Sequence, residues 1–141
     1  MYLPPNSTAQ AYFLWMLRYL VVQDWDMDDD GTPETLRLCF ATPKRWLEDG
    51  REIKVRRSPT AFGLVSLVVQ SRINKGEVTA KLELPTRNAA KQTLLRIRVP
   101  DGWRVISAKA GSHELEVDER GTVDVSKLKG KTSVRFRVAK L

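Results

Sequence analysis

A short acidic stretch holds the side chains best suited to bind a metal ion. Carboxylates two residues apart can converge on one calcium ion, and a glycine, here Gly31, permits the sharp bend of a calcium loop. The position that should supply a bidentate carboxylate is Arg37 instead. We therefore interpret the stretch as a solvated acidic linker and keep a calcium site as the alternative. Its candidate ligands are Asp26, Asp28, Asp30 and Glu34.

Two tryptophans could contact a carbohydrate. Trp46 follows Lys44 and Arg45, and Trp103 follows the turn at residues 100–102, where we expect it to be exposed. An indole ring can offer its face to a sugar or to a cation. A large aromatic side chain near a strand end more often closes the rim of a core. We prefer that structural interpretation for both residues and keep glycan contact as the alternative.

The charge of the chain is unevenly distributed. Residues 1–34 hold one basic and six acidic residues, a net charge of −5, and the remainder holds 23 basic and 11 acidic residues, a net charge of +12. Such asymmetry indicates a polyanionic partner or an acidic neighbouring domain. Proteins that bind single-stranded nucleic acid interleave aromatic side chains with basic ones, whereas the predicted strands carry aliphatic side chains. We therefore do not expect a nucleic-acid partner. The basic residues considered are Lys54, Arg56, Lys81, Arg96, Arg98, Arg135 and Arg137.

The sequence offers no set of residues for catalysis. One cysteine, Cys39, excludes a disulfide within the chain. The single histidine, His113, stands beside a predicted turn without an obvious carboxylate or nucleophile partner. We assign no catalytic residue and expect this chain alone not to be an enzyme.

The only long helix is predicted from Ala9 to Val22, with Ser7 or Thr8 as its cap. Its polar positions are Gln10 and Arg18, so apolar side chains lie on all sides of the helix. Such a helix needs burial nearly all round, but it is shorter than the roughly 20 residues needed to cross a membrane. We expect no membrane partner. The expected partner is a helical domain or a second copy of the chain, packed on Phe13, Trp15, Leu17 and Leu20.

The rest of the chain alternates apolar and polar residues with the period of a half-buried strand. After an acidic loop over residues 23–33 we predict a first strand with Leu36, Leu38 and Phe40 on one face, then a helical turn capped by Thr42. A meander of strands follows, joined by glycine-containing turns. The pattern predicts an antiparallel β-sandwich of about eight strands with one N-terminal α-helix. The predicted strands after the turn cover residues 52–57, 61–74, 77–84, 93–99, 104–110, 113–117, 122–125 and 133–138.

The segment Thr-Pro-Lys-Arg-Trp-Leu-Glu-Asp-Gly-Arg-Glu-Ile at 42–53, followed by Ser-Pro-Thr-Ala-Phe-Gly at 58–63, resembles a known family. It is similar to the start of the C-terminal β-sandwich that follows the (α/α)6 barrel in bacterial glycoside hydrolases. Segments 77–87 and 94–100 resemble later strands of that domain, and residues 9–22 resemble the last barrel helix. The chain departs from the pattern at 110–112, where Ala-Gly-Ser replaces an Asn-Gly hairpin.

This resemblance implies two parts: residues 1–34 as helix and acidic linker left from a preceding helical domain, and residues 35–141 as the sandwich. It implies a non-catalytic accessory module that packs on and stabilises a helical-barrel catalytic domain. The catalytic carboxylates would lie in that barrel, so none is assigned here. A free-standing carbohydrate-binding module is the alternative, and a basic nucleic-acid-binding domain is a weaker third. Residues 1–5 lack the pattern of a signal peptide, and the compartment stays open.

Overall fold

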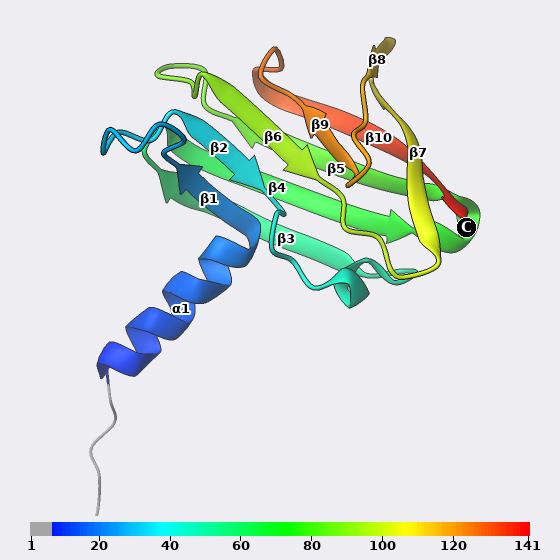
Figure 1. Cartoon of the computed structure of the whole chain (residues 1–141), viewed down its shortest axis with the longest axis horizontal. Coiled ribbons are helices and arrows are strands. Elements are labelled where there is room, and N and C mark those ends of the chain that lie inside the picture. Colours follow the sequence, from blue (N-terminus) through cyan, green and yellow to red (C-terminus); the bar gives the residue numbers. More distant parts are fainter. Residues whose placement is uncertain (1–6) are drawn as a thin grey trace, which may run out of the picture.

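The computed structural model describes residues 7–141, and it has one α-helix followed by ten strands in two sheets (Figure 1). Residues 1–5, which lack the pattern of a signal peptide, lie outside the described part. The elements are α1 (Ser7–Val21), β1 (Val22–Trp25), β2 (Thr35–Leu38), η1 (Lys44–Leu47), β3 (Glu52–Thr60), β4 (Gly63–Arg72), η2 (Ile73–Lys75), β5 (Glu77–Leu84), β6 (Gln92–Arg96), β7 (Trp103–Ala110), β8 (His113–Leu115), β9 (Thr122–Asp124) and β10 (Gly130–Lys140).

The predicted β-sandwich is confirmed, although it has ten strands rather than about eight. A four-stranded sheet has the order β1-β2-β6-β9, and a six-stranded sheet has the order β3-β4-β5-β10-β7-β8. Only β3, β4 and β5 form the predicted meander. The chain then crosses between the sheets, and β10 inserts between β5 and β7. All pairs are antiparallel except β2 with β6, which are parallel.

The core lies between the two sheets, and alternation along the strands explains it. In β5, Val78, Ala80 and Leu82 are buried, whereas Lys81 and Glu83 between and beyond them are exposed. In β10 the buried set is Val134, Phe136 and Val138. Because strand side chains point alternately to opposite faces, one face of each sheet contributes to a single core and the other meets solvent.

Strand β1 corrects the prediction of a loop from residue 23 onward. β1 pairs with β2, with Val22 opposite Leu38 and Trp25 opposite Thr35. This pairing joins the two predicted parts of the chain, residues 1–34 and 35–141, in one sheet. Val22 is fully buried. The backbone ladder and this burial outweigh the low strand propensity of the carboxylate in the middle of β1. The loop proper is therefore shorter than predicted.

Two local expectations at helix starts were wrong. α1 already includes Ser7, the first described residue, and Thr8, so both predicted capping residues lie inside the helix. The 3-10 turn η1 has Pro43 at its N-cap without a side-chain hydrogen bond. Thr42 is buried instead, and its Oγ1 donates to the carbonyl of Cys39 over 3.1 Å. The hydroxyl of Thr42 therefore bonds to a residue that precedes it in the chain and does not cap η1.

The backbone at Cys39 breaks the predicted apolar face of the first strand. Cys39 has φ of +61°, in the left-handed region, and β2 ends one residue earlier. Leu36 and Leu38 are buried as predicted, but Phe40 turns to the outer side and is half-buried. Its ring lies against the guanidinium of Arg96, 4.0 Å from Cζ to the ring centroid. The alternation rule failed here because it assumes extended backbone throughout.

Candidate functional site

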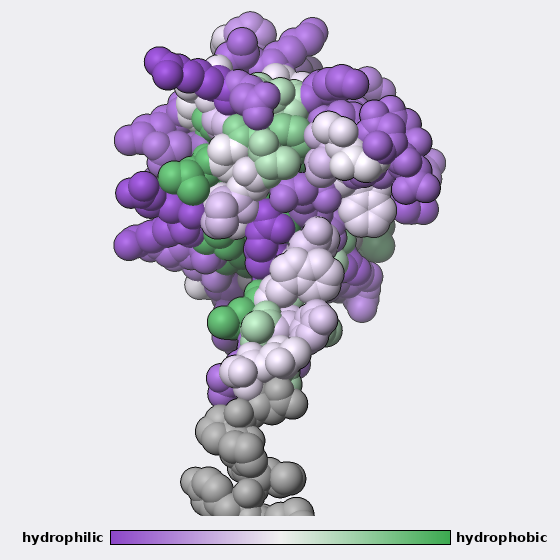
Figure 2. Space-filling model, turned by 90° about the vertical axis from the view of Figure 1, so that its left-hand side faces the viewer, coloured by the Kyte–Doolittle hydropathy of each residue, from purple (hydrophilic) through white to green (hydrophobic). Residues whose placement is uncertain are grey.

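Helix α1 stands away from both sheets, and only its C-terminal end reaches them (Figures 1 and 2). Phe13 is 60% exposed and Trp15 is 53% exposed, whereas Leu20 is half-buried and Val21 is buried. Of the four predicted packing residues, Phe13, Trp15 and Leu17 are thus exposed, and Leu20 packs against the core of the sandwich. No helix among the described residues has the length and apolar character to cross a membrane. The further exposed apolar residues of α1 are Tyr12, Leu14 and Met16.

A groove of about 840 Å³ lies at the base of α1, between the helix, η1 and β3. Leu17 and Val21 form its helical side, and Trp46 and Val55 add apolar surface from η1 and β3. Trp46 is half-buried and packs against the core, so the structural interpretation of this residue agrees with its position. The exposed apolar surface of α1 therefore continues into a groove on the sandwich.

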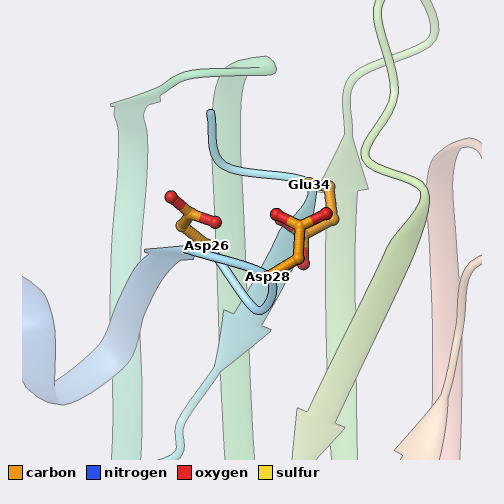
Figure 3. Close-up of side chains that lie close together, drawn as sticks. All are labelled: Asp26, Asp28 and Glu34. Atoms are coloured by element: carbon orange, nitrogen blue, oxygen red, sulfur yellow. The ribbon is translucent and has the colours of Figure 1, made fainter. Parts of the chain in front are cut away.

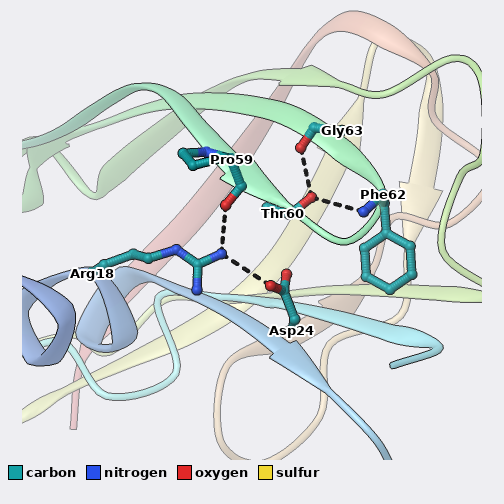
Figure 4. A network of polar contacts seen from close by, with 6 residues as sticks. All are labelled: Arg18, Asp24, Pro59, Thr60, Phe62 and Gly63. Atoms are coloured by element: carbon teal, nitrogen blue, oxygen red, sulfur yellow. Dashed lines mark hydrogen bonds and ion pairs between the residues drawn. The ribbon is translucent and has the colours of Figure 1, made fainter. Parts of the chain in front are cut away.

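The side chain of Arg18 joins the base of α1 to both sheets (Figure 4). Its Nη2 donates to Asp24 Oδ2 of β1 at 3.0 Å and to the Pro59 carbonyl of β3 at 2.6 Å. Gln23 Nε2 also donates to the carbonyl of Tyr19 over 2.9 Å. These contacts fix the direction in which α1 leaves the sandwich, so the helix is presented in one orientation.

The acidic loop gathers three of the four predicted metal ligands. Carboxylate oxygens of Asp26, Asp28 and Glu34 lie within 4.8 Å of one another (Figure 3). Asp30 is not in this group, because its Oδ1 accepts the N–H of Thr32 at 2.7 Å.

Two of the three clustered carboxylates, those of Asp26 and Glu34, accept backbone N–H groups of their own loop. Asp26 accepts the N–H groups of Asp30 and Gly31, and Glu34 Oε1 accepts the N–H of Met27. Hydrogen bonds from backbone N–H groups hold a carboxylate in place without a cation. This network explains the cluster as part of an ordered acidic loop.

The predicted basic residues do not share one face. Lys54, Lys81 and Arg135 are exposed on β3, β5 and β10 of the six-stranded sheet. Arg96 and Arg98 lie instead beside Trp103, on a groove formed by β6 and the start of β7. Trp103 was expected to be exposed but is half-buried. Sequence spacing could not bring these residues together, because the groove is built from segments of both sheets.

An aromatic and guanidinium stack on the four-stranded sheet was also missed. Arg37 Cζ lies 4.3 Å from the ring centroid of Trp25 and 5.2 Å from that of Phe40, and Arg96 lies on Phe40 as well. Burial lowers the pKa of Arg37, and the nearby charge of Glu34 opposes this shift. The signal was the alternation of aromatic and basic residues across paired strands, which becomes visible only once the pairing is known.

The candidate sites are therefore an exposed apolar helix with a groove at its base, an acidic loop, and a basic groove next to Trp103. No protein-family model, curated protein or solved structure matches this chain. These three surfaces are the features of the molecule that bear on its function.

Proposed function

We propose that this chain is a non-catalytic accessory β-sandwich that docks through α1 onto a helical domain. The observation that carries the proposal is the exposure of apolar side chains on the length of α1 from Tyr12 to Leu17. A helix that is apolar all round is stable in water only when other protein covers it. The groove at its base gives a second helix a place to pack, next to Trp46 and Val55.

A helical domain fits this surface better than a second copy of the chain. In a two-fold pair each α1 would bury one stripe on its partner and leave its other sides in water. Several neighbouring helices can cover the whole circumference. The resemblance of the sequence to a β-sandwich with the last barrel helix of glycoside hydrolases supports a barrel as that domain.

Charge supports an acidic partner. The groove at the base of α1 is lined by four basic and two acidic residues. Two of the basic residues, Arg51 and Lys54, lie 3.9 and 3.8 Å from Glu48 and Glu52, whereas Arg45 has no ion pair among the described residues. A partner with carboxylates around an apolar helical surface would complement this rim.

The test is co-expression of the chain with the product of the reading frame directly upstream of Met1. We expect a stable complex in which backbone amides of residues 9–17 are protected from hydrogen exchange. Phe13→Glu with Leu17→Glu should abolish it, because two charges cannot be buried in an apolar interface. The matched control is Lys81→Glu with Arg135→Glu, two exposed residues of the six-stranded sheet outside the groove, which should leave the complex intact.

Two outcomes would contradict the proposal. One is a full chain that binds no product of the upstream reading frame and is nevertheless monomeric by light scattering. The other is a defined dimer of the chain alone that fully protects α1, since a second copy would then be the natural cover.

The accessory role also implies that the isolated chain hydrolyses no glycoside. Hydrolysis needs one carboxyl group to protonate the leaving group and a second to act as nucleophile or base. Assays with aryl glycosides test this. Activity that survives purification and is lost on a single Asp or Glu substitution would show that the chain has a catalytic site of its own.

A further inference from the structure

A second groove, of about 790 Å³, lies on the other side of η1. Lys44 lines this groove, while its neighbours Arg45 and Trp46 line the groove at the base of α1. Five basic and two acidic residues surround it, so it is a strongly basic surface with some carboxylate acceptors. The residues that matter most are Phe40, Arg96, Arg98, Trp103, Arg104 and Glu119.

A β-bulge shapes the wall that carries Trp103. Ser107 pairs with Arg137 and Val105 pairs with Val138, which leaves Ile106 as the extra residue of β7. A bulge changes which face the side chains beyond it take, here those of the residues that precede Ile106 in β7. Ile106 is exposed, and Trp103 lies half-buried at the edge of the core. The bulge thereby directs an indole ring into the groove.

The floor of the groove is formed where two backbone segments touch. A Cβ atom at Gly121, which has φ of +76°, would lie 2.7 Å from the Ile97 carbonyl oxygen. The N–H of Ile97 donates to the Gly121 carbonyl at 2.9 Å. Only glycine allows this approach, so the floor is part of the folded architecture.

Arg96 is held ready to bind an anion. Its Nε donates to Thr122 Oγ1 at 2.8 Å, and its guanidinium lies on the ring of Phe40. Its two Nη groups have no hydrogen bond to a described residue. Burial lowers the pKa of Arg96; Asp118 opposes this, and Arg120, Arg37 and Arg98 add to it by repulsion. An anion in the groove would relieve that repulsion and accept two parallel N–H bonds.

The aromatic surface suits one ring rather than a row of bases. The ring of Phe40 is already contacted by two guanidinium groups. Trp103 has a single cation contact among the described residues, with Lys140 Nζ 5.4 Å from its ring centroid, so it is the less covered of the two rings and is the stacking surface of the groove. Platforms for single-stranded nucleic acid stack successive bases on several rings. Glu119 can accept hydrogen bonds from hydroxyl groups, which the rings of a sugar chain offer.

We propose that this groove binds an acidic oligosaccharide, a chain of sugar rings that carries carboxylate or sulfate groups. A sugar ring stacks on Trp103, and its anionic group binds the guanidinium groups of Arg96 and Arg98. Hydroxyl groups of the neighbouring sugars donate to Glu119. This site is independent of the docking of α1.

The experiment is isothermal titration of the full chain carrying Phe13→Glu, which limits self-association and lies outside the groove. The probes are trigalacturonate, a chondroitin sulfate tetrasaccharide, maltotriose and a six-residue oligothymidylate. We expect at least one acidic oligosaccharide to bind and maltotriose not to bind at about 1 mM. Binding of trigalacturonate shows that carboxylate groups are sufficient, whereas binding of the chondroitin fragment alone, which carries sulfate groups besides carboxylates, shows that sulfate is required.

Groove variants decide whether binding occurs at this site. Trp103→Ala and Arg98→Gln should each weaken binding about tenfold, since each removes one stacking or charge-assisted contact. Arg135→Gln removes the same charge from the six-stranded sheet and should leave binding unchanged. Circular dichroism checks the fold, and Arg98→Gln keeps the test valid if Trp103→Ala unfolds the chain.

Three results would overturn the proposal: no binding of either acidic oligosaccharide at about 1 mM, equal binding of maltotriose, or equal weakening by Arg135→Gln. Tighter binding of the oligothymidylate than of both acidic oligosaccharides would likewise replace the glycan with nucleic acid.

Discussion

Helix α1 and strand β10 are both rich in apolar residues, yet they end in opposite environments. Phe136 of β10 is fully buried and Phe13 of α1 is 60% exposed. In β10 apolar residues occupy alternate positions, so a single covering layer buries them all. In α1 they occupy every side, and no single layer can cover them. The comparison indicates that the chain itself covers the core of the sandwich, whereas it leaves most of α1 exposed, and the proposed docking would cover that surface.

Shortening the chain from its N-terminus should have the largest effect. A chain that begins at Leu17 keeps Arg18 and β1 but loses the exposed half of α1, so we expect a monomer. A chain that begins at Pro33 also loses β1 with the buried residues Val21 and Val22, each contributing about 1.5–3 kcal/mol by burial. We expect it to aggregate. Light scattering and urea denaturation compare the two chains, and equal stability would contradict the role of β1.

Matched phenylalanine substitutions measure the contrast directly. Phe136→Ala should lower the free energy of unfolding by about 3–5 kcal/mol, because it leaves a cavity in the core. Phe13→Ala should change it by less than about 0.5 kcal/mol, as expected for an exposed side chain. Both values come from urea denaturation at low protein concentration. A large loss of stability in Phe13→Ala would mean that α1 folds back on the sandwich in solution.

The thiol of Cys39 reports how tightly the sandwich excludes water. Burial raises the pKa of Cys39 to about 12 from its ordinary value of 9.0. Above pH 9 the unfolded chain therefore releases this proton while the folded chain retains it. Stability should fall with rising pH up to about 12, by at most about 1.4 kcal/mol per pH unit from this group.

The matched variant for Cys39 is Cys39→Ala, which keeps the same backbone strain and removes the ionisable group. The slope of stability against pH in the alkaline range should be smaller in the variant, as measured by urea denaturation between pH 8 and pH 11. The folded wild-type chain should also react slowly with a thiol reagent. An identical slope in both proteins would show that Cys39 is accessible to water.

Arg18→Ala should have a moderate effect, because Arg18 joins the two compared regions. The substitution leaves Asp24 Oδ2 and the Pro59 carbonyl without their donor, and Asp24 Oδ1 is already buried without a partner. We expect a loss of about 1–2 kcal/mol in urea denaturation. Arg45→Ala, which removes the same charge from an exposed residue without an ion pair among the described residues, is the control. Equal effects of the two substitutions would contradict an anchoring role.

The sequence was sufficient wherever the chain stays regular. Alternation in β5 and β10 predicted their buried residues, and the apolar circumference of α1 predicted a helix that the sandwich does not cover. Prediction failed where one residue redirects the backbone, as at Cys39 with its positive φ and at the bulge beside Ile106. Neither event has a periodic signature. The groove at Trp103 depends on both events, so no spacing in the sequence could have located it.

Calcium should have the smallest effect, because Asp26, Asp30 and Glu34 already accept N–H groups of the loop and position 37 lacks the bidentate carboxylate of a calcium loop. A ligand that binds only the folded state stabilises it by RT ln(1 + [L]/Kd), about 0.4 kcal/mol when a weak site is half occupied. For a chain of this size we expect a rise of about 1–2 °C in Tm at millimolar calcium. Differential scanning fluorimetry of the wild type and Asp28→Ala measures it. A rise of several degrees that disappears in Asp28→Ala would show that the acidic loop is a calcium site.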